Sequence, residues 1–186
     1  PERENCDGYA YDPEHPSQHI IDMSENEIEV PEDYTREELR QDLLCYTSPV
    51  LKENLVLTGD MTAELYISSD APDTDFVVRV TDVDENGRSI KLADGLLSAR
   101  YRNGFARSEF LQEGEIVCLK IRTTKLSNCF RKGHRIRVTV TSSAKNFIFP
   151  NSNTREGFAS ARTVVAHNRV YHGGVHASRL TVRVEP

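Results

Sequence analysis

Two alternating stretches constrain the fold more than any other part of the chain. Residues 61–68 (MTAELYIS) and 76–81 (FVVRVT) place an apolar side chain at every second position. A period of two is that of a β-strand with one buried face. Val77 lies on the opposite face of the second stretch, which indicates that this face is also partly covered. The intervening SSDAPDTD is rich in turn-forming residues and predicts a connection between two strands.

Similar short segments continue along the chain with turn residues between them. Asn86-Gly87 is its strongest hairpin signal. The stretch 134–143 (HRIRVTVTSS) predicts a strand with Ile136, Val138 and Val140 inward and Arg135, Arg137, Thr139 and Thr141 outward. The other predicted strands are LLCYTS, ENLVLTG, SIKLADG, LLSARYR, EIVCLKIRTT, TVVAHNRVYH and SRLTVRVE, in which Leu180, Val182 and Val184 share a face. Many short strands and almost no amphipathic helix predict an all-β fold, an antiparallel jelly-roll-like sandwich resembling galactose-binding domains.

The beginning of the chain has a different character. Residues 1–34 lack periodicity and contain Pro13, Pro16 and Pro31 among many acidic residues, which predicts an irregular arm, with the sandwich over residues 35–186. Residues 34–42 (YTREELRQD) contain Thr35 followed three positions later by Glu38. This capping-box pattern predicts one short helix.

The charge is unevenly distributed. Residues 1–50 carry 14 acidic and 3 basic side chains, a balance of −11, whereas the rest carries +5. Opposite charges attract, so an arm lying across the sandwich is expected. A pI of about 5.6 without a basic stripe disfavours nucleic-acid binding. No apolar run approaches the ~20 residues of a membrane helix, so no membrane partner is expected.

Cysteine use and the start of the chain suggest a cellular context. Cys6, Cys45, Cys118 and Cys129 show no CxxC spacing, so reduced thiols in the cytoplasm are predicted, with a disulfide pair as the alternative. The chain starts at Pro1 without a methionine or an apolar leader, and we therefore expect a fragment of a longer protein.

The common catalytic motifs are missing from the sequence. There is no GxSxG elbow, no glycine-rich phosphate loop ending in Lys-Ser/Thr and no HExxH. Sites assembled from distant residues need no such motif, so this observation favours a non-catalytic chain without excluding an enzyme. We predict no catalytic residue and no cofactor.

Three histidines, His167, His172 and His176, form the one cluster that suggests a metal. Three imidazoles with a water molecule can bind zinc and would make the chain an enzyme in its own right. Their spacing, however, spans a strand, the Gly173-Gly174 turn and the next strand. Surface or hydrogen-bonded histidines are therefore favoured over a metal site.

Two polar loops are further candidates. Asp70, Asp73 and Asp75 could supply oxygen ligands to calcium, although loop aspartates that cap backbone N–H groups are favoured. Phenylalanines lie in and beside the loop KNFIFPNSNTREG, which also contains asparagines. These residues, Phe147, Phe149, Asn151, Asn153 and Phe158, could face a partner or ligand, or the rings could anchor the loop to the core.

The order of several segments resembles one known family. SSDAPDTDFVVRVTDVDENGRSIKLADGLLSARYR, RKGHRIRVTVTSS, PNSNT and VYHGGVHASRLTVRV, preceded by GYAYDPEHP, resemble the C-terminal domain of the X-Pro dipeptidyl-peptidase and cocaine-esterase (CocE/NonD) serine hydrolases. Where relatives often have Gly-Gly after the YDP motif, this chain has Gln18-His19. That departure leaves the path of the arm open.

The resemblance implies a non-catalytic sandwich beside an N-terminal α/β-hydrolase domain, to which residues 1–34 would be the linker. The catalytic serine, aspartate and histidine would lie in that domain, since no position here matches them. The family contains dipeptidyl-peptidases, acylases and esterases, and subunits could associate as homo-oligomers. The alternative is an independent jelly-roll module that binds carbohydrate, which the absence of Trp and only 8% aromatic residues disfavour.

Overall fold

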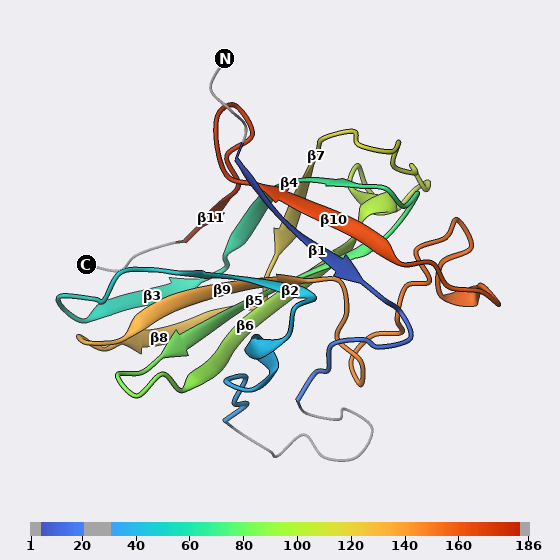
Figure 1. Ribbon diagram of the computed structural model, residues 1–186. Coiled ribbons are helices and arrows are strands. Elements are labelled where there is room, and N and C mark those ends of the chain that lie inside the picture. Colours follow the sequence, from blue (N-terminus) through green and yellow to red (C-terminus); the bar gives the residue numbers. More distant parts are fainter. Residues whose placement is uncertain (1–4, 21–30, 183–186) are drawn as a thin grey trace.

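The computed structural model describes residues 5–20 and 31–182. Two antiparallel sheets pack face to face, and a two-stranded ribbon extends from one end (Figure 1). In the described part, the helical segments are three single turns of 3-10 helix, η1 (Glu37–Leu39), η2 (Ala99–Tyr101) and η3 (Gly157–Ala159). None of them is long or apolar enough to cross a membrane. The predicted all-β antiparallel sandwich is thus confirmed, whereas the jelly-roll connectivity stays a prediction.

The first sheet contains five strands. Its main path runs β1 (Cys6–Tyr11), β10 (Ala166–Tyr171), β4 (Thr62–Ser69) and β11 (Arg179–Thr181), and β7 (Val117–Arg122) pairs with the other side of β4. β10 and β11 pair with successive halves of β4. The strand predicted first from the sequence, β4, therefore holds the sheet together.

The second sheet has the order β2 (Leu43–Thr47), β9 (Arg135–Thr141), β5 (Asp75–Val83) and β6 (Ser89–Ser98). The ribbon pairs β3 (Leu55–Gly59) with β8 (Leu126–Phe130). β5 and β6 form the hairpin predicted from Asn86-Gly87, with Gly87 at a φ of +85° in its turn. The two runs SIKLADG and LLSARYR were predicted as separate strands, but residues 89–98 form one.

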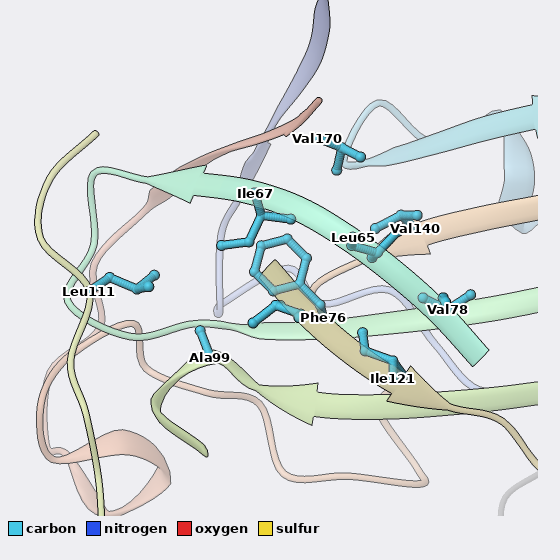
Figure 2. Packing of buried hydrophobic residues seen from close by; sticks show 11 residues of the cluster. Leu65, Ile67, Phe76, Val78, Ala99, Leu111, Ile121, Val140 and Val170 are labelled. Carbon is cyan, nitrogen blue, oxygen red and sulfur yellow. The ribbon is translucent and has the colours of Figure 1, made fainter. Parts of the chain in front are cut away.

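The main core lies between the two sheets. Figure 2 shows Leu65 and Ile67 of β4 packed toward Phe76 and Val78 of β5, with Val140 of β9 beside them. These are the inward positions that the alternation predicts. β4 and β5 do not pair with each other, so the connection 70–74 carries the chain from one sheet to the other.

The arm is less irregular than predicted. Residues 6–11 form β1, because Tyr9 and Tyr11 alternate inward and are buried, and the strand pairs with β10 along its whole length. The Tyr9 hydroxyl lies 2.8 Å from Ser142 Oγ. The division proposed at residue 35 stays a prediction.

The predicted helix over 34–42 shrinks to the single turn η1, and the capping box does not form. Arg36, not Thr35, precedes the turn, and it makes no side-chain cap. The Thr35 hydroxyl donates to Asp33 Oδ1 at 2.5 Å, and the Glu38 carboxylate turns toward the second sheet. Thr35 therefore bonds to Asp33 and Glu38 to the sheet, in place of the reciprocal bonds of a capping box.

Residues 31–42, the end of the arm with the η1 turn, lie against the outer face of the second sheet, and this corrects the prediction for β9. Thr139 and Thr141 were expected to face solvent but are fully buried, as are Arg79 and Thr81 of β5. Ion pairs join the acidic residues 1–50 to the basic remainder of the chain, as the charge distribution predicts. These join Lys91 Nζ to Glu32 (2.6 Å), Arg88 Nε to Asp33 (2.8 Å) and Arg137 Nη1 to Glu38 (2.5 Å).

The four cysteines form no disulfide with one another and are free thiols. Burial, the largest effect, raises the pKa of Cys45 and of Cys118, and the charges of Glu38 and Glu64 add to this. Neither thiol is therefore activated as a nucleophile.

Candidate functional site

Four segments meet at one end of the sandwich, opposite the β5–β6 hairpin (Figure 1). They are residues 12–20 after β1, 70–74 between the sheets, 99–116 between β6 and β7, and 142–165 between β9 and β10. We call this surface the loop end. Most of the candidate residues from the sequence lie here.

A buried polar network joins three of these segments. The Arg100 side chain donates from Nε to Asp73 Oδ2 (2.7 Å) and from Nη2 to the carbonyl oxygen of Thr154 (3.0 Å). Asn151 Nδ2 donates to Asp73 Oδ2 (2.7 Å) and to Asp75 Oδ1 (2.9 Å). Because these groups are buried, each bond fixes one loop against another.

The two aspartates of the network lie beneath the surface. Asp73 and Asp75 are buried with Asn151, so they support the loops from within. Burial raises the pKa of Asp75, and the negative charge of Asp73 adds to this, against the hydrogen bonds from Ser98 and Asn151. The sequence offered no signal for Arg100, which supplies the positive charge.

Asp70 differs from its neighbours because its carboxylate reaches the surface. Its Oδ1 accepts the backbone N–H of His167 (2.8 Å), and its Oδ2 lies 2.7 Å from His167 Nδ1. Burial raises the pKa of Asp70, but these contacts outweigh it and lower the pKa. Asp70 therefore ties the 70–74 connection to the start of β10.

The histidines each have different neighbours. His167 contacts Asp70, His172 Nε2 lies 3.1 Å from Asp7 Oδ2, and the His176 ring lies 5.2 Å from the ring of Tyr66. Within residues 5–20 and 31–182, no group of three or more His, Cys, Asp or Glu side chains could hold a metal ion. The structure thus gives no support to a zinc site or to calcium at Asp70, Asp73 and Asp75.

The phenylalanines of the 142–165 loop do not behave alike. Phe147 is partly exposed and stacks on the buried His19, with ring centroids 5.0 Å apart. Phe149 and Phe158 are 80% and 76% exposed and stack on each other at 5.9 Å. Because both rings are largely exposed, they do not anchor the loop to the core.

The loop end also carries many exposed apolar side chains. Most of the exposed large apolar side chains lie there, namely Ile20, Phe105, Phe147, Phe149, Phe158, Val164 and Val165. Two grooves lie among these loops. One is lined by Pro13, Pro16, Phe147, Phe149 and Pro150, and the other by Asp70, Pro72, Asn153, Arg155, Arg162 and Val165.

Asn153, at the floor of the second groove, has a left-handed backbone with a φ of +62°. Its Nδ2 donates to the carbonyl oxygen of Val164 at 2.6 Å, which closes the loop on itself. Asparagine tolerates this conformation better than most residues. Asn153 therefore fixes the path of the 142–165 loop beside this groove.

Comparison with known proteins identifies the fold and the family. The family model described as X-Pro dipeptidyl-peptidase C-terminal non-catalytic domain matches residues 4–181. Cocaine esterase of Rhodococcus sp. (strain MB1 Bresler) is 35% identical over 97% of this chain, and a putative serine esterase of Mycobacterium bovis is 33% identical over 76% of it. The chain covers 32% and 24% of these two relatives, so it spans a third of their length or less.

Solved structures show the same fold. An aminopeptidase from a Thaumarchaeota archaeon superposes with a TM-score of 0.91 at 24% identity, over 99% of this chain and 34% of that one. An α-amino acid ester hydrolase gives 0.91 at 22% identity, over 99% and 33%. With the model match over residues 4–181, these comparisons show that the chain belongs to the family of X-Pro dipeptidyl-peptidase C-terminal non-catalytic domains, found in CocE/NonD-type hydrolases.

Proposed function

We propose that the chain is the accessory domain of a serine hydrolase, a dipeptidyl-peptidase, acylase or esterase, and that it packs against an N-terminal α/β-hydrolase domain. There it walls one side of the active-site cleft and supports domain packing. The observation that carries this proposal is the 35% identity to an esterase over 97% of this chain but only 32% of the esterase. The catalytic serine, aspartate and histidine would then belong to the remaining part.

The loop end is the surface that suits such packing. Exposed aromatic rings lose contact with water when a partner covers them, at roughly 25 cal/mol for each Å² of apolar area. Contiguous exposed apolar patches on soluble proteins usually mark interaction sites. The buried bonds among Arg100, Asp73 and Asn151 hold the surface in one shape before a partner arrives.

The test compares three polypeptides: this chain, its full-length parent, and the parent lacking residues 5–182. We expect aryl-ester or aminoacyl-ester hydrolysis by the parent, none by this chain, and strongly reduced turnover by the shortened parent. Hydrolysis by this chain at the rate of the parent would refute the accessory role. So would a parent whose preceding sequence lacks a hydrolase domain.

The stacked pair of Phe149 and Phe158 also bears on a second candidate function, a carbohydrate-binding module. Exposed rings are the groups on which such modules stack sugars, and both rings are more than three-quarters exposed. A glycan panel tests this directly, with the Phe149→Ala variant as control. Saturable binding that the variant loses would favour the module, and no signal above background would reject it.

A further inference from the structure

We propose that Phe149, Arg155 and Phe158 are the energetic centre of the contact with the hydrolase domain, and that the facing surface is apolar with a carboxylate opposite Arg155. This inference rests on the proposed function and adds the residues and the chemistry of the partner. The three side chains lie on one loop, between β9 and β10.

The aromatic pair provides the apolar part of the contact. The two rings stack at 5.9 Å with an interplanar angle of 25°, so each restricts the other while one surface stays open. Burying an aromatic side chain removes about 150–250 Å² from water. Contact centres in protein interfaces are enriched in aromatic residues and arginine, which is the composition found here.

Arg155 provides the charged part. Its guanidinium lies over the Phe110 ring at 4.6 Å, and Arg100 lies 5.1 Å from the centroid of the same ring. Phe110 thereby orients Arg155. No carboxylate of the described residues forms an ion pair with Arg155, although the residue is exposed. A guanidinium held in place without a counter-charge is suited to a carboxylate on a partner.

The loop beneath these side chains is held rigidly. Arg100 Nη2 donates to the carbonyl oxygen of Thr154, immediately before Arg155. Gly157, immediately before Phe158, has a φ of +64°, and a Cβ at that position would lie 3.2 Å from Arg100 Nη2. The loop is therefore largely ordered before the partner binds, which lowers the entropic cost of binding.

Charge favours a partner with an acidic rim over a second copy of this loop. Residues 142–165 carry Lys145, Arg155 and Arg162 against Glu156, a balance of +2, so two copies of this loop would repel each other. The turn at the opposite end, residues 84–88 (DENGR), is polar throughout. Because this chain spans only about a third of its esterase relative, we assign the occupant as the hydrolase domain of the same polypeptide.

Amide hydrogen exchange locates the contact. The full-length parent and this chain are labelled in parallel, and the exchange of residues 149–158 is compared with that of residues 84–88. We expect residues 149–158 to exchange at least roughly tenfold more slowly in the parent, with no change at the hairpin turn. Protection of the turn instead of the loop would overturn the inference.

Variants measure the contribution of each group. Phe149→Ala with Phe158→Ala should lower the thermal midpoint of the parent by several degrees but leave this chain unchanged, since both rings are exposed in it. Leu39→Ala, which removes a side chain that is also 76% exposed, should change neither. Arg155→Glu should lower the midpoint of the parent, and the effect should diminish in high salt. Arg131→Glu, at an exposed site in the opposite β8–β9 turn, is its control.

The outcomes separate this inference from the proposed function. If removing residues 5–182 abolishes turnover while the phenylalanine variants leave the parent unchanged, the accessory role stands and the assigned centre is wrong. If this chain sediments as a dimer that Phe149→Ala dissociates, the occupant is a second copy and the inference also fails. If deleting residues 5–182 leaves turnover intact, the proposed function itself fails.

Discussion

The guanidinium carbon of Arg79 lies 4.2 Å from the centre of the Tyr34 ring, and both side chains are fully buried. None of the three guanidinium nitrogens of Arg79 has a hydrogen-bond partner among the described residues. The charge is therefore held by the face of the ring. A buried cation over an aromatic ring gains about 2 kcal/mol or more.

Removing the ring should cost more than removing the charge. We expect Tyr34→Leu to lower the free energy of unfolding by at least about 2 kcal/mol, because Arg79 would lose its ring partner. Arg79→Met keeps much of the volume and removes the buried charge, so it should cost less. Urea unfolding of the single and double variants measures the coupling, expected at about 1–2 kcal/mol. Strictly additive effects would show that the stacking does not stabilise the arm.

The network at the loop end supports a second prediction. Arg100→Met leaves the fully buried Asp73 carboxylate without its cation and should cost about 3–5 kcal/mol in urea unfolding. Arg107→Met is the matched control, because its pair with Glu109 is at the surface and its side chain is 83% exposed. That change should cost less than about 0.5 kcal/mol. Equal costs for the two variants would contradict the role of the network.

The structure explains which features local sequence could predict. β4, β5 and β9 each contain enough alternation to identify a strand, and Asn86-Gly87 identifies one hairpin. The burial of Thr139 could not be predicted, since the segment around Glu38 that lies against this face comes from residues about a hundred positions earlier. The bond from Arg100 to Asp73 also spans 27 residues without any local pattern.

Candidate site residues were predictable by type but not by depth. Turn-forming aspartates identified residues 70–74 as a connection, and the asparagine- and phenylalanine-rich stretch was identified as a loop, but nothing local predicted that the two meet at one end. Only tertiary packing decides that Asp73 is buried and Phe149 is exposed to solvent. Neighbouring loop positions do not alternate between inward and outward directions, so the sequence holds no signal for this. Arg155 became a candidate only through its stacking on Phe110.

Asp94 on β6 should make stability depend on pH under acidic conditions. Burial raises the pKa of Asp94, but hydrogen bonds from His19 and Lys91 and the charge of Lys91 outweigh it and lower the pKa to about 2. Because the ionised form is favoured in the folded state, its contribution is complete above the unfolded value of 3.8 and is lost as pH falls through 2. The difference corresponds to about 2 kcal/mol.

The measurement is urea unfolding between pH 5 and pH 2 for the wild type and Asp94→Asn. The difference in the free energy of unfolding between the wild type and Asp94→Asn should decrease as pH falls below about 4. Asp33→Asn is the control, because the pKa of Asp33 is also lowered to about 2, chiefly by the hydrogen bond from Thr35, but its ion pair with Arg88 is exposed. The difference in the free energy of unfolding between the wild type and Asp33→Asn should be much smaller. If the difference in the free energy of unfolding between the wild type and Asp94→Asn stayed constant from pH 5 to pH 2, the Asp94 carboxylate would not be stabilised by folding.

The close approach of the β7 backbone explains why β6 contains a glycine, Gly95, in its interior. A Cβ at this position would lie 2.4 Å from the backbone oxygen of Arg122, at the end of β7. Since the obstacle is backbone, no side-chain rotation relieves it, and Gly95→Ala should cost about 2–3 kcal/mol in urea unfolding. Gly8→Ala is the control, because its Cβ would approach the Asn168 oxygen only to 3.3 Å and a small shift suffices. If Gly95→Ala were as stable as the wild type, β6 and β7 could not approach as closely as the structure places them.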